Sequence, residues 1–452
     1  MLRAFLNTFF FIVSGVLYFN APDFYSYGFC SLISILFLLQ NILYFVFKRD
    51  RSIVGFAFFF AIAFGLTNFI YPVFYYLSDP EFSLFSLPFN ESVISRSTSI
   101  AYVGYAIYML VMDFTELIFE NRSYENKIEN LDIKKVIKII YVFLLVFLAA
   151  YFVTGGHQAL ASEYSGEGEI IEKGVTAYIY VLVVATAIIL SIFMFANEIP
   201  IKQRILYFIS IVFLMIFFLA LGSRTFPLML ALSSIVSYNN NIRKISAPVL
   251  LLLVIAGAVV LTFIVFARTT SFTSQDYVAN ALAEADINMI WDFGSDLVIN
   301  NRNLYSLIDY ADNFGHTYGL SMLGGLSSPI PFAQSFICST FDIQPEFLSS
   351  SGFSTYIDLG LGSTWGLGTN LVADAYLPFG MIGVLFFFGL LGFIVAKSKA
   401  MINSNIYWSV CYYVLVSNAV FFARGGFFDC FRFMIWGIVI IYIISFFRKV
   451  EF

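Results

Sequence analysis

Charged residues are scarce in this sequence. Only 12% of the 452 residues are Asp, Glu, Lys or Arg, about half the share of a typical soluble domain. By contrast, 60% of the residues are hydrophobic and the mean hydropathy is +0.86. This composition excludes an ordinary soluble fold. Because a backbone in lipid must satisfy its own hydrogen bonds, long apolar runs favour helices, and we expect an all-α polytopic membrane protein.

The sequence also has few residues that bind metals or form disulfides. There are two histidines, and the four cysteines lack the spacing of a metal site. Cys338 and Cys430 should lie on the same side of the membrane and could pair, although two free thiols are the more common outcome. We expect no metal site and no cofactor.

Apolar runs of membrane length number about twelve. The eighth run is too short to cross the membrane upright. It could form a re-entrant segment or be continuous with the seventh span. The predicted spans cover residues 4–20, 27–47, 52–77, 98–119, 136–154, 174–196, 204–222, 225–238, 246–267, 371–396, 406–423 and 431–447.

Basic residues divide unequally between alternate loops. Seventeen lie on one side of the predicted membrane and seven on the other, and for lysine alone the split is ten against one. Basic residues gather in cytoplasmic loops. We therefore expect both termini in the cytoplasm and the long loop outside.

The longest polar stretch covers residues 268–370, with helical parts before it (1–267) and after it (371–452). This extracytoplasmic loop has ten acidic residues and no lysine, which argues against nucleic acid as a partner. Apolar residues recur at helical spacing between residues 281 and 311, so we expect short helices there. Residues 314–331, rich in Gly, Ser and Pro, are predicted to be irregular.

An acidic pair in the loop, Glu284 and Asp286, superficially resembles the metal-binding pair of some glycosyltransferases. A solvated helix start is the simpler interpretation of so short a motif.

Arginine persists on the outward side, although lysine is nearly absent there. Arg224 ends an apolar run, and Arg268 begins the long loop. Arg424 and Arg432 bracket a turn that contains two glycines. A guanidinium group can bind phosphate through two parallel hydrogen bonds, which makes these arginines candidate anion-binding residues. Helix capping by Arg224 and a salt bridge from Arg432 to Asp429 are the structural alternatives.

Two outward residues are candidates for proton transfer. Asp374 stands at the outer end of a long span, where it is partly desolvated, and is a candidate general base. His316 could be an acid, a base, a phosphate contact or a plain hydrogen-bonding residue.

Taken together, these residues resemble the Wzy-type polymerases of O-antigen and related repeat-unit polysaccharides. The resemblance rests on the layout, on Leu-Gly-Ser-Arg ending at Arg224, on Ala-Asp-Ala-Tyr-Leu-Pro-Phe-Gly from Ala373 to Gly380, and on Arg424-Gly425-Gly426. It covers nearly the full chain. Residues 329–332, Pro-Ile-Pro-Phe, depart from related sequences, which often place a basic residue after the prolines.

The resemblance implies a membrane-embedded glycosyltransferase of lipopolysaccharide biosynthesis, on the periplasmic face of the bacterial inner membrane. It would transfer a growing glycan from undecaprenyl diphosphate onto a lipid-linked repeat unit, with Asp374 or His316 as the base. Membrane lipids and a protein that regulates chain length are the other expected partners. The diphosphates would bind Arg224, Arg268, Arg424 and Arg432, and the sugar rings would stack on aromatic residues such as Trp291, Tyr305, Tyr318 and Trp365.

Two other functions stay open at the level of sequence. An O-antigen ligase shares the carrier, the topology and the outer loop, but uses lipid A core as its acceptor. A polysaccharide flippase or transporter would carry charges along mid-membrane helices and show internal pseudo-symmetry. The charges here gather at outer helix ends and no repeat is visible, which favours the polymerase.

Overall fold

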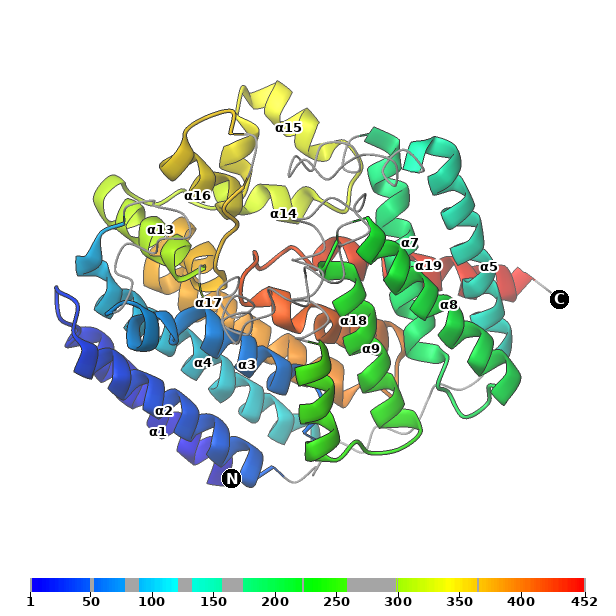
Figure 1. The fold of residues 1–452 in the computed structure, drawn as a ribbon, viewed down its shortest axis with the longest axis horizontal. Helices are drawn as coiled ribbons and strands as arrows, with labels where there is room; N and C mark the ends of the chain where they lie inside the picture. The colour runs from blue at the N-terminus through cyan, green and yellow to red at the C-terminus, as the bar shows by residue number, and fades with distance from the viewer. Residues whose placement is uncertain are drawn as a thin grey trace, which may run out of the picture. The chain divides into compact units, whose positions relative to one another are not determined.

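The described residues of the computed structural model form helices and no strands (Figure 1). Seven of these helices are long and apolar enough to cross a membrane, and four shorter apolar helices accompany them. The protein is therefore an all-α polytopic membrane protein, as its composition predicts. The structure describes residues 2–48, 53–77, 89–120, 132–156, 174–221, 223–257, 298, 300–363 and 366–450.

The helices of the predicted membrane segments are α1 (Leu2–Phe19), α2 (Tyr27–Val46), α3 (Phe56–Asn68), α4 (Ile94–Glu120), α5 (Ile133–Tyr151), α7 (Gly174–Phe193), α8 (Ile201–Ala220), α9 (Thr225–Asn241), a helix over Ala247–Gly257, α17 (Leu371–Ala400), α18 (Ile406–Phe422) and α19 (Phe431–Val450). The long loop contributes α13 (Asn300–Phe314), α14 (Leu323–Ser327), α15 (Ala333–Phe341) and α16 (Ser350–Leu359). Single turns are η1 (Tyr71–Tyr75), η2 (Glu91–Val93), η3 (Phe152–Gly156), η4 (Leu320–Met322) and η5 (Pro345–Leu348).

Helices occur at each predicted span, but three expectations need correction. The third span is not one helix, because α3 ends at Asn68 and the π-helical turn η1 follows. The Asn68 side chain bonds the Phe64 carbonyl and Pro72 has no N–H to continue the helix. The eighth span does not merge with the seventh, because α9 is a separate helix that packs on α7 and α8. Residues 314–331 are not wholly irregular, since η4 and α14 lie within them.

The chain packs as two compact units. One comprises Met1–Glu129 and Val298–Arg432, and the other Asn130–Leu297 and Phe433–Phe452. In the first unit α17 packs most extensively against α4, α1 also packs on α4, and α3 packs on α18. In the second, α5 packs on α7, and α7 and α8 pack on α9. The division into residues 1–267, 268–370 and 371–452 stays a prediction.

Helix α17 is kinked close to its N-terminal end. Pro378 lies inside it and Gly380 has a φ of 60°, in the region that favours glycine. The loop passes beside this kink, where the backbone N–H groups of Thr317 and Tyr318 donate to the carbonyls of Leu377 and Pro378, each at 3.1 Å. The long loop is thus tied through its main chain to the segment of α17 that carries Asp374.

Candidate functional site

Asp374 lies in the first turn of α17 and is only 3% exposed. Asn370 caps this helix by accepting a hydrogen bond from the Val372 N–H at 2.9 Å, and it also donates to the Asn68 side chain at 3.0 Å. The cap fixes where α17 begins. It therefore also fixes which way the Asp374 carboxylate points.

In the part of the chain that the structure describes, the groups that hydrogen-bond the Asp374 carboxylate are neutral. The Ser350 hydroxyl donates to its Oδ1 atom, and the Phe427 backbone N–H donates to Oδ2 at 2.7 Å. Among the described residues no basic side chain forms an ion pair with it. Ser350 reaches it because Ser349 caps α16, accepting from the Gly352 N–H at 3.0 Å.

A small pocket opens beside Asp374, with about 30 Å³ of space for a water-sized group. It is built by segments that are far apart in the sequence: η4, the start of α14, the start of α16, the start of α17 and the turn before α19. Its lining residues are Ser321, Met322, Gly325, Ser349, Ser350, Ser351, Thr369, Asp374, Gly426, Phe428 and Asp429.

Asp429 brings a second carboxylate to this pocket. Its Oδ2 atom accepts from the Gly426 N–H at 2.6 Å, and its side chain remains accessible to solvent. Dense protein around it raises the pKa of the Asp429 carboxyl, while the Gly426 bond and the nearby Arg432 charge act in the opposite direction. Asp429 is therefore a solvent-accessible acid at the same pocket as the buried Asp374.

Two backbone N–H groups of the turn between α18 and α19 bond carboxylates. Paired glycines in such a turn suggest a backbone that approaches an anionic ligand. Here the Gly426 and Phe427 N–H groups instead bond the carboxylates of Asp429 and Asp374. These two N–H groups are therefore already bonded within the protein, and the half-buried Arg424 and Arg432 stand on either side of the turn.

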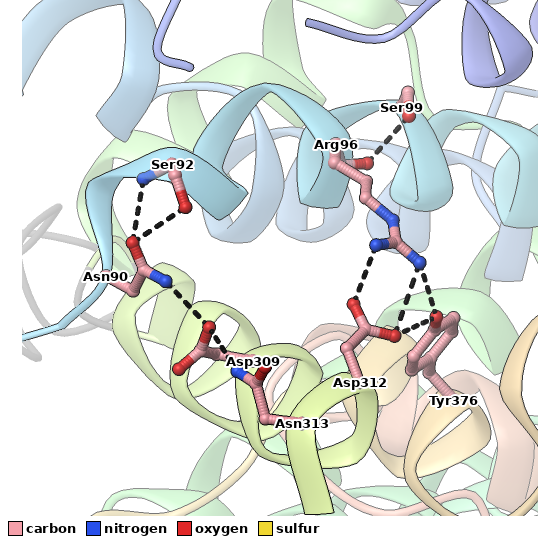
Figure 2. A network of polar contacts seen from close by, with 8 residues as sticks. All are labelled: Asn90, Ser92, Arg96, Ser99, Asp309, Asp312, Asn313 and Tyr376. Atoms are coloured by element: carbon pink, nitrogen blue, oxygen red, sulfur yellow. Dashed lines mark hydrogen bonds and ion pairs between the residues drawn. The ribbon is translucent and has the colours of Figure 1, made fainter. Parts of the chain in front are cut away.

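A second polar cluster joins α4, α13 and α17 near the same end of α17. Arg96 of α4 lies 2.9 Å from the Asp312 carboxylate of α13 and donates to the Tyr376 hydroxyl of α17 at 3.1 Å (Figure 2). Tyr376 in turn donates to Asp312 at 2.7 Å. Asn90 bonds Asp309 one turn earlier on α13, at 2.8 Å. The cluster ties the long loop to both helices.

His316 belongs to the surroundings of Tyr376. Its ring meets the Tyr376 ring edge-on, with centroids 5.8 Å apart, and its Nδ1 atom has no hydrogen-bond partner among the described residues. His316 is not among the described residues that line the Asp374 pocket. The structure thus gathers Asp374 with Asp429 at one pocket and places His316 elsewhere.

The remaining predicted residues are dispersed. Arg224 occupies the N-cap position of α9 in the second unit and is half-buried. Tyr318 is 83% exposed, so its ring is free to stack on a sugar. Tyr305 is fully buried against Tyr71 and Phe89, which removes its ring from any sugar-binding surface in this conformation. Arg268, Trp291, Trp365, Glu284 and Asp286 lie outside the described residues.

Sequence reasoning missed several members of the pocket. Thr369 and the serines at 349–351 carry no motif, and Asp429 was considered only as a partner of Arg432. The run of three serines before a helix is a capping signal, but it does not predict that Ser350 meets a residue 24 positions later. Cys338 and Cys430, considered as a disulfide pair, are both free thiols.

Comparison with known proteins places the chain in a family. A family model described as O-antigen polysaccharide polymerase Wzy matches residues 2–451. No curated protein matches the sequence, and no solved structure does. Because the match covers nearly the whole chain, including both clusters at the N-terminal end of α17, this protein belongs to the O-antigen polysaccharide polymerase Wzy family.

Proposed function

We propose that this protein polymerises oligosaccharide repeat units carried on undecaprenyl diphosphate, at the periplasmic face of the bacterial inner membrane. Membership of the polymerase family over residues 2–451 carries the reaction class. The unequal division of lysine and arginine between loops supports cytoplasmic termini and an outward long loop. The pocket at Asp374 supplies a place for the chemistry.

The transfer reaction needs a base and a stabilised leaving group. The oxygen of an acceptor hydroxyl attacks the anomeric carbon of the donor glycan. The bond from that carbon to the diphosphate oxygen breaks, and undecaprenyl diphosphate leaves with the bonding electrons. The hydroxyl proton passes to the Asp374 carboxylate, which Ser350 and the Phe427 N–H hold in place. His316 is the alternative base.

Arginines stabilise the charge that develops on the departing diphosphate in this proposal. Arg424 and Arg432 flank the turn that borders the pocket, which supports a diphosphate position beside Asp374 and not inside the acidic pocket. We propose Arg224 and Arg268 as further diphosphate contacts. Sugar rings of the glycan would stack on Tyr318 and on Trp291 and Trp365.

The polysaccharide made by a deletion strain tests the function. A polymerase deletion should leave single repeat units attached to the lipid A core. A ligase deletion would leave no attached repeats and accumulate lipid-linked polymer. Purified protein should in addition elongate lipid-linked repeat units without any other enzyme, and failure to do so would reject the proposal.

Substitution of two arginines, one at the site and one as a control, tests the proposed diphosphate binding. Arg424→Ala should remove long-chain polysaccharide at a normal protein level, because the leaving group loses a two-pronged partner. The matched control is Arg243→Ala, which removes an exposed arginine in a predicted cytoplasmic loop and should leave the chain-length ladder intact. A normal ladder in Arg424→Ala would contradict the role.

A further inference from the structure

We propose that the pocket beside Asp374 is the acceptor subsite: Asp374 and Thr369 bind the attacking hydroxyl, and Asp429 binds the neighbouring hydroxyl of the same sugar. This inference deepens the proposed function and rests on it. It assigns two further residues to the reaction and separates the acceptor position from that of the diphosphate.

Thr369 supplies the first observation. Its side chain is 3% exposed and lines the pocket, yet its Oγ1 atom has no hydrogen-bond partner among the described residues. A buried hydroxyl without a partner is costly, and most buried polar groups in proteins are bonded. Thr369 therefore needs a polar occupant in the pocket to complete its bonding.

The two carboxylates supply the second observation. Their Oδ1 atoms face one point beside Gly426: an added Cβ there would lie 3.1 Å from that of Asp429 and 3.5 Å from that of Asp374. An ionised carboxylate only accepts hydrogen bonds, so the occupant must donate. A phosphate would be repelled by both carboxylates and has only acceptor oxygens to offer.

A hydroxyl group meets the hydrogen-bonding requirements of Asp374, Asp429 and Thr369. It can donate its proton to Asp374 and accept a bond from Thr369, while an adjacent hydroxyl donates to Asp429 at the solvent-accessible side. The pocket volume of about 30 Å³ admits about one water-sized group. The hydroxyl enters and the sugar ring stays at the mouth, so the acceptor is a sugar with two neighbouring free hydroxyls.

The test uses full-length purified protein, a labelled lipid-linked donor, and the strain's own repeat-unit oligosaccharide as a simple glycoside. Because this glycoside has no diphosphate, it can act only as acceptor. Thr369→Val keeps the shape and removes the hydroxyl, so the acceptor KM should rise about fivefold, as expected for one lost hydrogen bond. The donor KM should stay unchanged. Thr340→Val, an exposed threonine on α15, is the matched control and should change neither constant.

Gly426→Ala places a methyl group between the two carboxylates. The acceptor KM should rise more than about tenfold, with an unchanged donor KM and an unchanged melting temperature. Gly389→Ala is the control, since a Cβ there meets side-chain atoms only at 3.7 Å or beyond. Asp429→Asn should remove the preference for the native acceptor over one that lacks the neighbouring hydroxyl.

The outcomes separate the two proposals. If wild-type protein elongates the acceptor but Thr369→Val and Gly426→Ala leave the acceptor KM unchanged, or raise the donor KM instead, the subsite is rejected and the polymerase stands. If wild-type protein transfers no glycan to either acceptor or lipid-linked repeats, the polymerase fails and the subsite with it.

Discussion

The two ends of α17 carry polar clusters of opposite character. At its C-terminal end, Lys399 bonds Glu116 of α4 at 3.0 Å, and Arg3 of α1 lies 3.1 Å from Glu116 and 3.4 Å from Asp113. Asn7 donates to Asp113 in the same cluster. At its N-terminal end, Asp374 accepts hydrogen bonds from two neutral donors, the Ser350 hydroxyl and the Phe427 N–H, and shares its pocket with a second acid.

The two clusters differ in how their charges are matched, which fits a structural role for the first and the proposed proton transfer for the second. Two cations matched to two anions between helices hold α1, α4 and α17 together, because each charge finds its partner within the protein. A buried carboxylate without a cation costs free energy, and such a cost is characteristic of sites where a proton or a charged substrate must be handled. Four substitutions at the two ends of α17 test whether the clusters differ in this way.

Replacing the carboxylate at the N-terminal end should abolish activity without unfolding the protein. Asp374→Asn removes the base and should slow polymerisation at least about 100-fold, because general-base catalysis contributes that much or more. The rate is measured with purified protein and lipid-linked repeats, and folding by thermal melting. Asp342→Asn is the control, since Asp342 is exposed and its left-handed backbone (φ 52°) suits Asn equally well. A rate within threefold of wild type would remove Asp374 from the mechanism.

Neutralising a carboxylate in the cluster at the C-terminal end of α17 should lower the stability of the protein and leave its activity intact. Glu116→Gln removes the negative charge that Arg3 and Lys399 share. The free energy of unfolding should fall by about 2 kcal/mol, because both ion pairs are largely but not wholly buried. Activity per folded molecule should persist at a permissive temperature. Glu198→Gln changes an exposed glutamate and should be neutral. Loss of activity at an unchanged melting temperature would show that the cluster does more than hold helices together.

A smaller effect should follow from weakening the support of Asp374. Ser350→Ala removes one hydrogen bond to the carboxylate and should lower kcat about fivefold, as the loss of about 1 kcal/mol of positioning would. The exposed Ser339→Ala is the matched control. An effect confined to KM, with kcat intact, would mean that Ser350 contacts substrate and does not position the base.

The smallest effect is expected at the cluster of Figure 2. The Arg96 and Asp312 side chains are 38% and 21% exposed, so solvent and salt screen their attraction. Asp312→Asn should therefore change the free energy of unfolding by less than about 1 kcal/mol, and by less still at high salt. Melting curves at two salt concentrations measure the change in stability and its dependence on salt. A larger loss that salt does not reduce would place this cluster with the buried one at Glu116.

Hydrophobic length alone predicted most of the fold. Apolar runs of span length must become helices in lipid, and helices occur at each of them. The break after Asn68 escaped prediction because it depends on a side chain that bonds its own backbone and on Pro72 four residues later. A side chain that competes for a backbone hydrogen bond leaves the hydropathy of the segment nearly unchanged, so a hydropathy pattern does not reveal the break.

The site was predictable only in part. Asp374 is a candidate from the sequence because a carboxylate at the end of a span is unusual, and the structure places it at a pocket. Thr369 and Asp429 become candidates only when the fold brings distant segments together. Two other arginines that the predicted topology places outside form ion pairs: Arg96 pairs with Asp312, and the buried Arg302 pairs with Asp358 at 2.6 Å. Arg96 therefore binds the long loop to α4, and Arg302 joins two helices within the loop. Sequence alone does not separate such roles from the proposed anion binding.

The attachment of residues 317–318 beside the kink of α17 has an evolutionary consequence. Those bonds join main-chain N–H and C=O groups. Every amino acid supplies the C=O and every one except proline supplies the N–H, so the bonds place little restriction on side-chain identity. If Tyr318 contacts the glycan as proposed, this exposed position can change to suit another carbohydrate while the segment stays anchored beside α17. A scaffold of this kind can change its glycan preference by ordinary point mutation.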